Sequence, residues 1–202
     1  MGKQLPGKWA IITAGGSGNR MGSSLPKQFL ELKGWPILMH TLSAFKNADP
    51  TIHLVLVLPE KEIQRWRNLC IQFDFKVECI VAKGGNTRFQ SVKNGLNEIH
   101  DNNALISVHD GVRPIISPAL INRVYNEAER LGNAIPVVPI KESIRKVEGN
   151  QSFIANREKY RIIQTPQCFR AEQLKPAFEQ PYDPSFTDEA NVVEMAGNAI
   201  HL

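Results

Sequence analysis

The regular alternation of short apolar runs with longer amphipathic stretches is the feature that most limits the possible folds. The clearest run, His53–Leu58 (HLVLVL), is followed by Pro59 and is typical of a parallel strand covered on both faces. Further strands are predicted at Trp9–Thr13, Lys76–Val81, Ala104–His109 and Ala134–Val138. Helices are predicted at Ile37–Ala48, Lys61–Phe73, Arg88–Ile99 and Pro118–Leu131. This order predicts an α/β fold with a mostly parallel, twisted sheet and helices on both faces.

The pattern changes after Pro139. The segment Ile140–Arg161 is polar and weakly alternating, with a turn signal at Glu148-Gly149-Asn150. It predicts a β-hairpin that leaves the main sheet. A strand at Ile162–Gln164 and a helix at Ala171–Gln180 are expected to return to the body. The 202 residues are expected to form a single domain.

Composition excludes several classes of protein. With 42% hydrophobic and 22% charged residues the chain is neither disordered nor membrane-like. Its net charge of +4 is mild and no block of like charges marks a nucleic-acid tail. No apolar run approaches the roughly 20 residues of a membrane span. Three separated cysteines and a polar N-terminus predict free thiols, no signal peptide, no protein-built metal site and a cytoplasmic location.

The first segment that could carry chemistry is a glycine-rich loop that follows the first predicted strand. Its sequence AGGSGNRMG begins at Ala14, and Pro26-Lys27-Gln28 follows shortly after. Glycines let backbone N–H groups approach phosphate oxygens closely. The loop lacks the third glycine of a dinucleotide fingerprint and the Gly-Lys-Ser/Thr of a P-loop, but carries its own cations, Arg20 and Lys27. A flexible turn with two solvated charges is the alternative.

Two further segments also follow predicted strands, at the edge where open α/β sheets bind ligands. Gly84-Gly85-Asn86-Thr87-Arg88 precedes Ser91 and could face a base edge, or could simply be a helix start capped by Asn86 or Thr87. Val108–Pro114 (VHDGVRP) places Asp110 and Arg113 one loop apart. A structural Asp–Arg pair, or a histidine satisfied within the core, would explain that segment without a ligand.

The last third of the chain contributes Arg157, Thr165-Pro166-Gln167 and Phe186–Ala190 (FTDEA). Asp188 and Glu189 are expected in the first turn of a helix with Thr187 as its cap, which is a sufficient structural reason for them.

Taken in order, the segments AGGSGNRMG, PKQ, GGNTR-x-x-SV, VHDGVRP, TPQ and FTDEA resemble the 2-C-methyl-D-erythritol 4-phosphate cytidylyltransferase family of the non-mevalonate isoprenoid pathway. The resemblance extends from about Trp9 to the end of the chain. It implies a Rossmann-like α/β domain with a β-arm that crosses to a second subunit of a homodimer. The predicted hairpin at Ile140–Arg161 falls where that arm should be.

The resemblance also implies the chemistry. The phosphate of a sugar-alcohol phosphate attacks the α-phosphorus of CTP, and pyrophosphate leaves. Arg20 and Lys27 match the catalytic cations, and Mg²⁺ would be held mainly by the nucleotide. The implied nucleotide contacts are Ala14, Gly15, Gly16, Gly18, Gly85, Asn86 and Ser91. The implied substrate contacts are Asp110, Arg113, Ser143, Arg157, Thr165 and Thr187, of which Ser143 stands where the family often has threonine.

One departure from the family concerns the end of the chain. The family continues to a strand with N-I-K-x-T, whose lysine touches substrate, and to a closing helix, whereas this sequence stops at Leu202. We expect that a strand and a helix are missing from it. Three alternatives stay open: a ribitol-5-phosphate cytidylyltransferase, a sugar-1-phosphate nucleotidyltransferase using UTP or dTTP, and a non-catalytic nucleotide-binding module.

Overall fold

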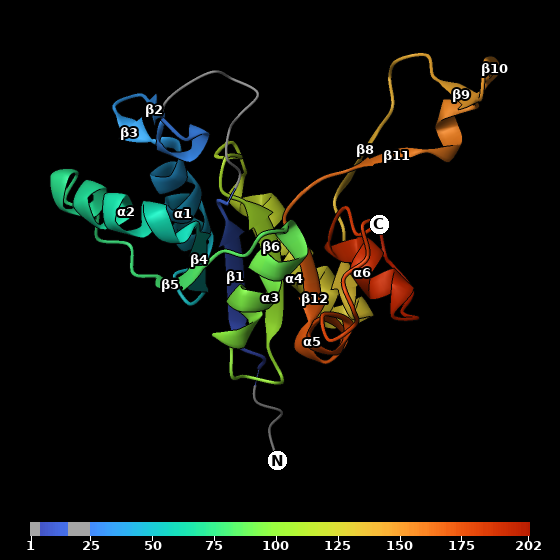
Figure 1. Cartoon of the computed structure of the whole chain (residues 1–202). Coiled ribbons are helices and arrows are strands. Elements are labelled where there is room, and N and C mark those ends of the chain that lie inside the picture. The colour runs from blue at the N-terminus through green and yellow to red at the C-terminus, as the bar shows by residue number, and fades with distance from the viewer. Residues whose placement is uncertain (1–4, 16–24) are drawn as a thin grey trace.

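A central sheet organises the computed structural model, which describes residues 5–15 and 25–202. Within the described residues six strands pair in the order β5-β4-β1-β6-β12-β7 (Figure 1). Four of them are mutually parallel: β1 (Lys8–Thr13), β4 (His53–Leu58), β5 (Ile80–Lys83) and β6 (Leu105–Asp110). Strand β12 (Gln167–Arg170) runs antiparallel to both β6 and β7 (Asn133–Ala134). The predicted α/β fold with a mostly parallel sheet is confirmed.

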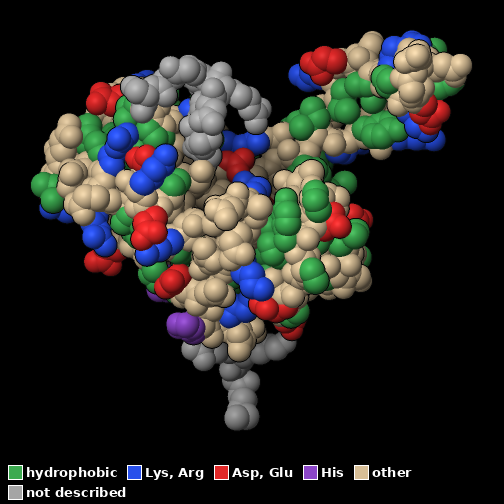
Figure 2. All heavy atoms as spheres, in the orientation of Figure 1, with side chains coloured by type: hydrophobic (Ala, Val, Ile, Leu, Met, Phe, Trp, Pro, Cys, Tyr) green, Lys and Arg blue, Asp and Glu red, His purple; other side chains and the backbone are tan. Residues whose placement is uncertain are grey.

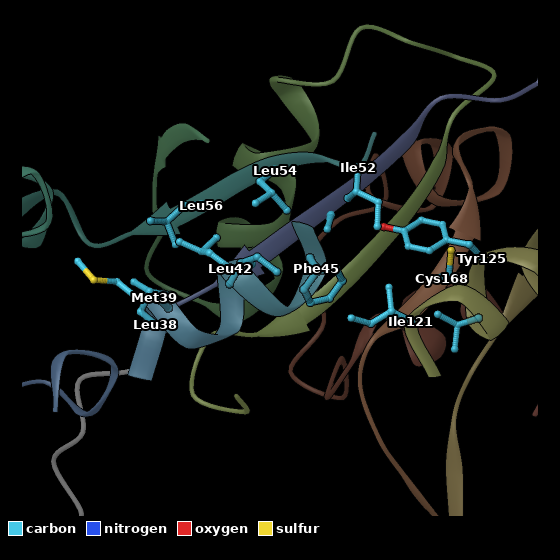
Figure 3. Packing of buried hydrophobic residues seen from close by; sticks show 14 of the residues in the cluster. Leu38, Met39, Leu42, Phe45, Ile52, Leu54, Leu56, Ile121, Tyr125 and Cys168 are labelled. Carbon is cyan, nitrogen blue, oxygen red and sulfur yellow. The ribbon is translucent and has the colours of Figure 1, made fainter. Parts of the chain in front are cut away.

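Helices cover both faces of this sheet because successive strand residues point to opposite sides. Leu54 and Leu56 of β4 pack with α1 (Ile37–Ala48), α2 (Glu60–Gln72) and α4 (Pro118–Leu131). Val55 and Val57 pack with α3 (Arg88–Asn97), α5 (Ala171–Ala177) and α6 (Glu189–Met195). Figure 3 shows the first cluster, in which α1 places Leu38, Leu42 and Phe45 beneath the sheet. In the described part of the chain no helix is both long and apolar enough to cross a bilayer.

A two-part arm leaves the body between β7 and β12. Its base pairs β8 (Val137–Pro139) with β11 (Arg161–Ile163), and its outer part pairs β9 (Arg145–Glu148) with β10 (Gln151–Ile154). A 3-10 turn at Arg157–Lys159 connects β10 to β11. The arm projects away from the sheet (Figure 1), as the polar sequence of Ile140–Arg161 predicted. Apolar side chains nevertheless lie on its surface (Figure 2), among them Val147 and Ile154 with exposed fractions of 70% and 87%.

Two strand predictions were wrong near the edges of the sheet. The strand predicted at Lys76–Val81 begins only at Ile80, because the residues that pair with β4 are Ile80–Lys83. The strand predicted at Ala134–Val138 is divided between β7 of the main sheet and β8 of the arm. Both boundaries depend on which strands pair with each other, and the local alternation of apolar and polar residues gives no information about pairing.

The chain's return to the body was also predicted incorrectly. Ile162–Gln164 was expected in the body, but Ile162 and Ile163 belong to β11 of the arm. The strand that re-enters the sheet is β12, which the sequence analysis missed. The following helix, predicted to Gln180, ends at Ala177. Strand β12 is antiparallel because the chain comes back from the arm at the carboxyl edge of the parallel strands, without a crossover helix.

The hydroxyl of buried Tyr125 links α4 to the sheet. It donates to the Trp9 carbonyl oxygen at 2.7 Å and lies 2.8 Å from the Ser107 hydroxyl. We expect Tyr125→Phe to lower the free energy of unfolding by about 1–3 kcal/mol, because it removes a partner from buried polar groups. Urea unfolding measures the loss. Tyr182→Phe, at a half-exposed tyrosine, is the control and should change stability by less than about 0.5 kcal/mol. Equal effects would contradict this view of the core.

Candidate active site

The segments singled out in the sequence converge at the carboxyl edge of the parallel strands. Backbone hydrogen bonds align them: the Ala14 N–H donates to Val57, the Gly84 N–H to Leu58, and the Gly111 N–H to the Thr13 carbonyl. The ends of β5, β4, β1 and β6 are therefore fixed side by side, in that order. Open α/β sheets bind their ligands at this edge.

Two of the predicted nucleotide-binding segments come together here. Gly85 donates its N–H to the Ser91 hydroxyl oxygen at 3.0 Å, and that hydroxyl donates to the Thr87 carbonyl at 2.8 Å. A Cβ on Gly15 would lie 3.8 Å from the same Ser91 oxygen. Asn86 lies exposed beside them. The predicted contacts Gly16 and Gly18 lie outside the described residues.

The helix that begins at Arg88 is capped by Thr87, whose hydroxyl accepts from the Gln90 N–H at 3.0 Å. Thr87 was one of the two caps expected. The cap and the Gly85 turn are separate features of one loop, so a structural role for Thr87 leaves the exposed turn available to a ligand.

Lys27 opens a short 3-10 helix, Lys27–Phe29, next to the end of β1. The helix is fixed there because the buried Gln28 amide donates to the Ala14 carbonyl at 2.8 Å. Lys27 itself is partly exposed, and no carboxylate among the described residues pairs with it. Arg20, the other predicted catalytic cation, lies outside the described residues.

Asp110, at the end of β6, lies between two arginines. Its Oδ1 accepts from Arg88 Nη1 at 2.7 Å, and its Oδ2 lies 2.8 Å from Arg113 Nε. Arg113 also donates from Nη1 to Gln164 Oε1 at 2.7 Å. The Asp–Arg pair considered in the sequence analysis therefore exists. It forms at the ligand edge with 46% of the Arg113 side chain exposed, so a structural pair and a binding site are compatible here.

Arg88 is a site residue that the sequence analysis quoted without assigning a role. It binds the Glu189 carboxylate through two bonds, Nε to Oε1 at 3.1 Å and Nη2 to Oε2 at 2.9 Å. Burial alone would lower the pKa of the Arg88 guanidinium, but attraction to Glu189 and Asp110 outweighs burial and raises that pKa above its ordinary value. Arg88 is thus permanently charged. The sequence did contain a signal for this role: Arg88 starts a helix one turn after a Gly-Gly bend at a strand end.

His109, next to Asp110 in β6, forms a partly buried contact with Thr165. The Arg113 carbonyl lies 3.0 Å from His109 Nε2, which must therefore donate, so Nδ1 accepts from the Thr165 hydroxyl at 2.9 Å. Burial lowers the pKa of His109 to about 4, and the ring is neutral at physiological pH. The predicted substrate residue Thr165 is thus brought to the Asp110 loop.

The start of α6 corrects one expectation. Asp188, and not Thr187, is the cap, because its Oδ1 accepts from the Asn191 N–H at 2.9 Å. Its other oxygen accepts from the Gln167 amide at 3.1 Å, and Gln167 Oε1 accepts from the Ala190 N–H at 2.8 Å. The Asp188 carboxylate therefore accepts from both the Asn191 N–H and the Gln167 amide. Thr187 is left exposed next to the Arg88–Glu189 pair.

The two predicted substrate residues of the arm are not joined to this group. Ser143 is exposed in the connection between β8 and β9. Arg157 is exposed as well, and its guanidinium donates to the Lys141 carbonyl of the same arm. Because the arm projects from the body (Figure 1), these residues are placed for contacts beyond their own sheet.

The donors at this edge do not form a metal cage. Within residues 5–15 and 25–202, no three His, Cys, Asp or Glu side chains cluster in a way that could hold an ion. Both oxygens of Asp110 already bind arginines. A cavity of about 320 Å³ lies at the other end of the sheet, lined in part by Asn102, Arg170 and Glu172, and is separate from the residues described above.

The neutral state of His109 predicts how stability depends on pH. The pKa of an unfolded histidine is about 6.5, so the unfolded chain takes up the proton first and the free energy of unfolding should fall between about pH 6.5 and pH 4, by up to about 3 kcal/mol. Urea unfolding across this range measures the slope. His109→Gln should lose it, whereas His100→Gln, at an exposed position, should keep it. Identical slopes in all three proteins would contradict the assignment.

Comparison with known proteins identifies the family of the chain. A family model described as 2-C-methyl-D-erythritol 4-phosphate cytidylyltransferase matches residues 9–202. The protein of that name from Bacteroides thetaiotaomicron is 48% identical over 192 residues, 95% of this chain and 87% of the relative. Its counterpart from Porphyromonas gingivalis is 46% identical over 93% of this chain and 83% of the relative. The solved Francisella tularensis structure matches with a TM-score of 0.77 at 31% identity, covering 96% of this chain and 89% of that one. The chain therefore belongs to the 2-C-methyl-D-erythritol 4-phosphate cytidylyltransferase family.

Proposed function

We propose that the protein transfers a cytidylyl group from CTP to 2-C-methyl-D-erythritol 4-phosphate, releasing pyrophosphate, as a step of isoprenoid precursor biosynthesis. The observation that carries the proposal is the meeting of two groups at one sheet edge. Gly15, Gly85 and Ser91 form a backbone-rich surface suited to a nucleotide. Asp110 and Arg113, at the adjacent strand end, offer an acceptor and a cation to a polyol phosphate.

The reaction needs no protein nucleophile. A phosphate oxygen of the acceptor forms a new bond to the α-phosphorus of CTP, and the bond from that phosphorus to the oxygen bridging to the β-phosphorus breaks. The electron pair leaves with pyrophosphate. Catalysis is then positioning and electrostatic stabilisation, as in phosphoryl transfer generally. We assign the stabilisation to Lys27, whose short helix is fixed next to the end of β1, together with Arg20.

The acceptor binds on the β6 side of the site. Asp110 Oδ2 is the natural partner for an acceptor hydroxyl, and Arg113, Thr165 and Thr187 line the remainder of this side. Arg113 is the cation for the acceptor phosphate, because nearly half of its side chain is exposed. Arg157 of the partner subunit is assigned to the same phosphate.

Magnesium is proposed to enter with the triphosphate, not to be held by the chain. Among the described residues, no group of three His, Cys, Asp or Glu side chains could hold an ion. Mg²⁺ commonly keeps several waters and binds substrate phosphates with few protein carboxylates. A cytoplasmic location is proposed on the three free thiols, Cys70, Cys79 and Cys168, which suit a reducing compartment.

Pyrophosphate release from each of the four nucleoside triphosphates, with several acceptors, tests this function. We expect turnover with CTP and 2-C-methyl-D-erythritol 4-phosphate, and little with UTP or ATP. Preference for ribitol 5-phosphate would identify the sister activity. Turnover of a hexose 1-phosphate with UTP would identify a sugar-1-phosphate enzyme. Nucleotide binding without pyrophosphate release from any pair would reduce the protein to a binding module.

A homodimer built through the arm is part of the proposal. Apolar Val147, Phe153, Ile154 and Ile162 are exposed on the arm's narrow ladders, and two-stranded hairpins are marginal without a partner surface. A second copy of the chain would cover these side chains. It would also bring Arg157 to a site that lies beyond the arm's own body.

Complementation tests the shared site. Lys27→Ala and Arg157→Ala should each lower turnover by roughly 10²–10³, the typical cost of losing one preorganised charge. Mixed dimers of the two should regain activity, because one of the two sites then has both residues and the other has neither. Lys159→Ala, an exposed cation in the same turn, should remain active and serves as the control. If native mass spectrometry shows mixed dimers that are no more active than the separate variants, the site is not shared.

A further inference from the structure

We infer that Arg88 is a positioning residue that holds the Asp110 carboxylate in place for the acceptor substrate. The inference rests on the proposed function, because that function makes Asp110 a substrate contact. It assigns to the start of α3 a task in acceptor recognition that is separate from the nucleotide turn preceding it.

The position of Arg88 joins three elements at the site. Its guanidinium reaches Asp110 at the end of β6 at 2.7 Å, Glu189 at the start of α6 at 2.9 and 3.1 Å, and the Thr13 hydroxyl of β1 at 3.4 Å. A guanidinium is planar with donors in fixed directions, so these partners set its orientation. The orientation of Arg88 in turn sets that of the Asp110 carboxylate.

The two arginines on Asp110 differ in how easily they can leave it. The Arg113 side chain is 46% exposed and its other partner is the Gln164 amide, so it can turn towards an incoming phosphate at small cost. Removing Arg88 would leave Glu189, whose side chain is 2% exposed, as an unpaired buried carboxylate. Breaking a buried ion pair from one side is strongly unfavourable. Arg88 is therefore the fixed partner, and Arg113 the exchangeable one.

Because only one of the two arginines can leave easily, the two oxygens of Asp110 have different roles. When Arg113 moves to the acceptor phosphate, Oδ2 becomes free to accept a hydrogen bond from an acceptor hydroxyl. Oδ1 stays on Arg88, so the carboxylate keeps its direction. Without Arg88, the same carboxylate could rotate, and acceptor binding would lose a prearranged partner.

A double-mutant cycle on the full-length protein tests the inference, with Arg88→Lys, Asp110→Asn and the double variant. Lysine keeps the charge but not the fork that binds both carboxylates. Arg88→Lys should raise the KM for 2-C-methyl-D-erythritol 4-phosphate by roughly tenfold or more, the usual effect of losing a hydrogen bond to a charged group. The Kd for CTP, measured by equilibrium dialysis, should change by less than about threefold. In the Asp110→Asn background, Arg88→Lys should add less than about twofold, because Arg88 acts through Asp110.

Two controls separate positioning from a loss of fold. Lys93→Gln removes an exposed ion pair to Glu179 from the same helix and should leave both constants unchanged. If Arg88→Lys does not fold, as judged by urea unfolding, Arg88→Met combined with Glu189→Gln removes the buried charge with its partner and takes its place in the cycle. Glu189→Gln alone supplies the reference from which the effect of Arg88→Met is then measured.

The outcomes are distinct. If the effects of Arg88→Lys and Asp110→Asn on the acceptor KM multiply in the double variant, the inference is overturned. It is also overturned if Arg88→Lys weakens CTP binding as much as it raises the acceptor KM. A wild-type protein without pyrophosphate release from CTP and 2-C-methyl-D-erythritol 4-phosphate would overturn the proposed function instead. An active wild type with non-additive substitutions supports both.

Discussion

Burial of the parallel sheet on both faces is the constraint on which the rest of the structure depends. The interiors of β1, β4 and β6 are filled by alternating apolar side chains that serve two separate helical layers. A polar group within these strands would lose its hydration without a partner, at a cost of about 1–3 kcal/mol. Charged side chains are therefore excluded from most of each strand. It gathers where the strands end, and Asp110, Arg88 and Lys27 lie at that edge.

The site edge is organised by mutual compensation of its charges. Arg88 pairs with both Glu189 and Asp110, so the nearly inaccessible Glu189 carboxylate has a cationic partner beside the ligand surface. His109 adds no charge, because burial keeps its ring neutral. Backbone packing is equally tight: a Cβ on Gly111 would lie 3.0 Å from Leu38 Cδ1 and 3.1 Å from the Ala14 Cβ. A side chain at residue 111 would therefore force its neighbours to shift by a few tenths of an ångström.

Much of this architecture was predictable from local sequence. The run HLVLVL identified β4 because a strand buried on both faces tolerates few polar residues. Pro118 and the preceding Ser117 mark the beginning of α4, where a residue without an N–H costs nothing. The glycine-rich segments and Asp110 were found by the same logic, since glycines and a lone Asp after apolar runs fall at strand ends. The roles of Arg157, Thr165 and Thr187 came from the family resemblance instead. Strand β12 was missed because Cys168 and Phe169 form a run too short to be told from a loop.

The sequence by itself determined the fold class, the ligand edge of the sheet and the segments that reach it, because hydrophobic period and turn chemistry are local properties. Only the tertiary structure decided which charges pair. Arg88 and Glu189 are separated by 101 residues, yet form a bidentate contact, and nothing local to either residue encodes the other. Asp188, and not Thr187, caps α6 for the same reason: the Asp188 carboxylate also accepts from Gln167, which comes from β12. Such pairs form because the chain topology brings together side chains that are far apart in sequence. The residues next to each partner in the sequence do not reveal the other partner.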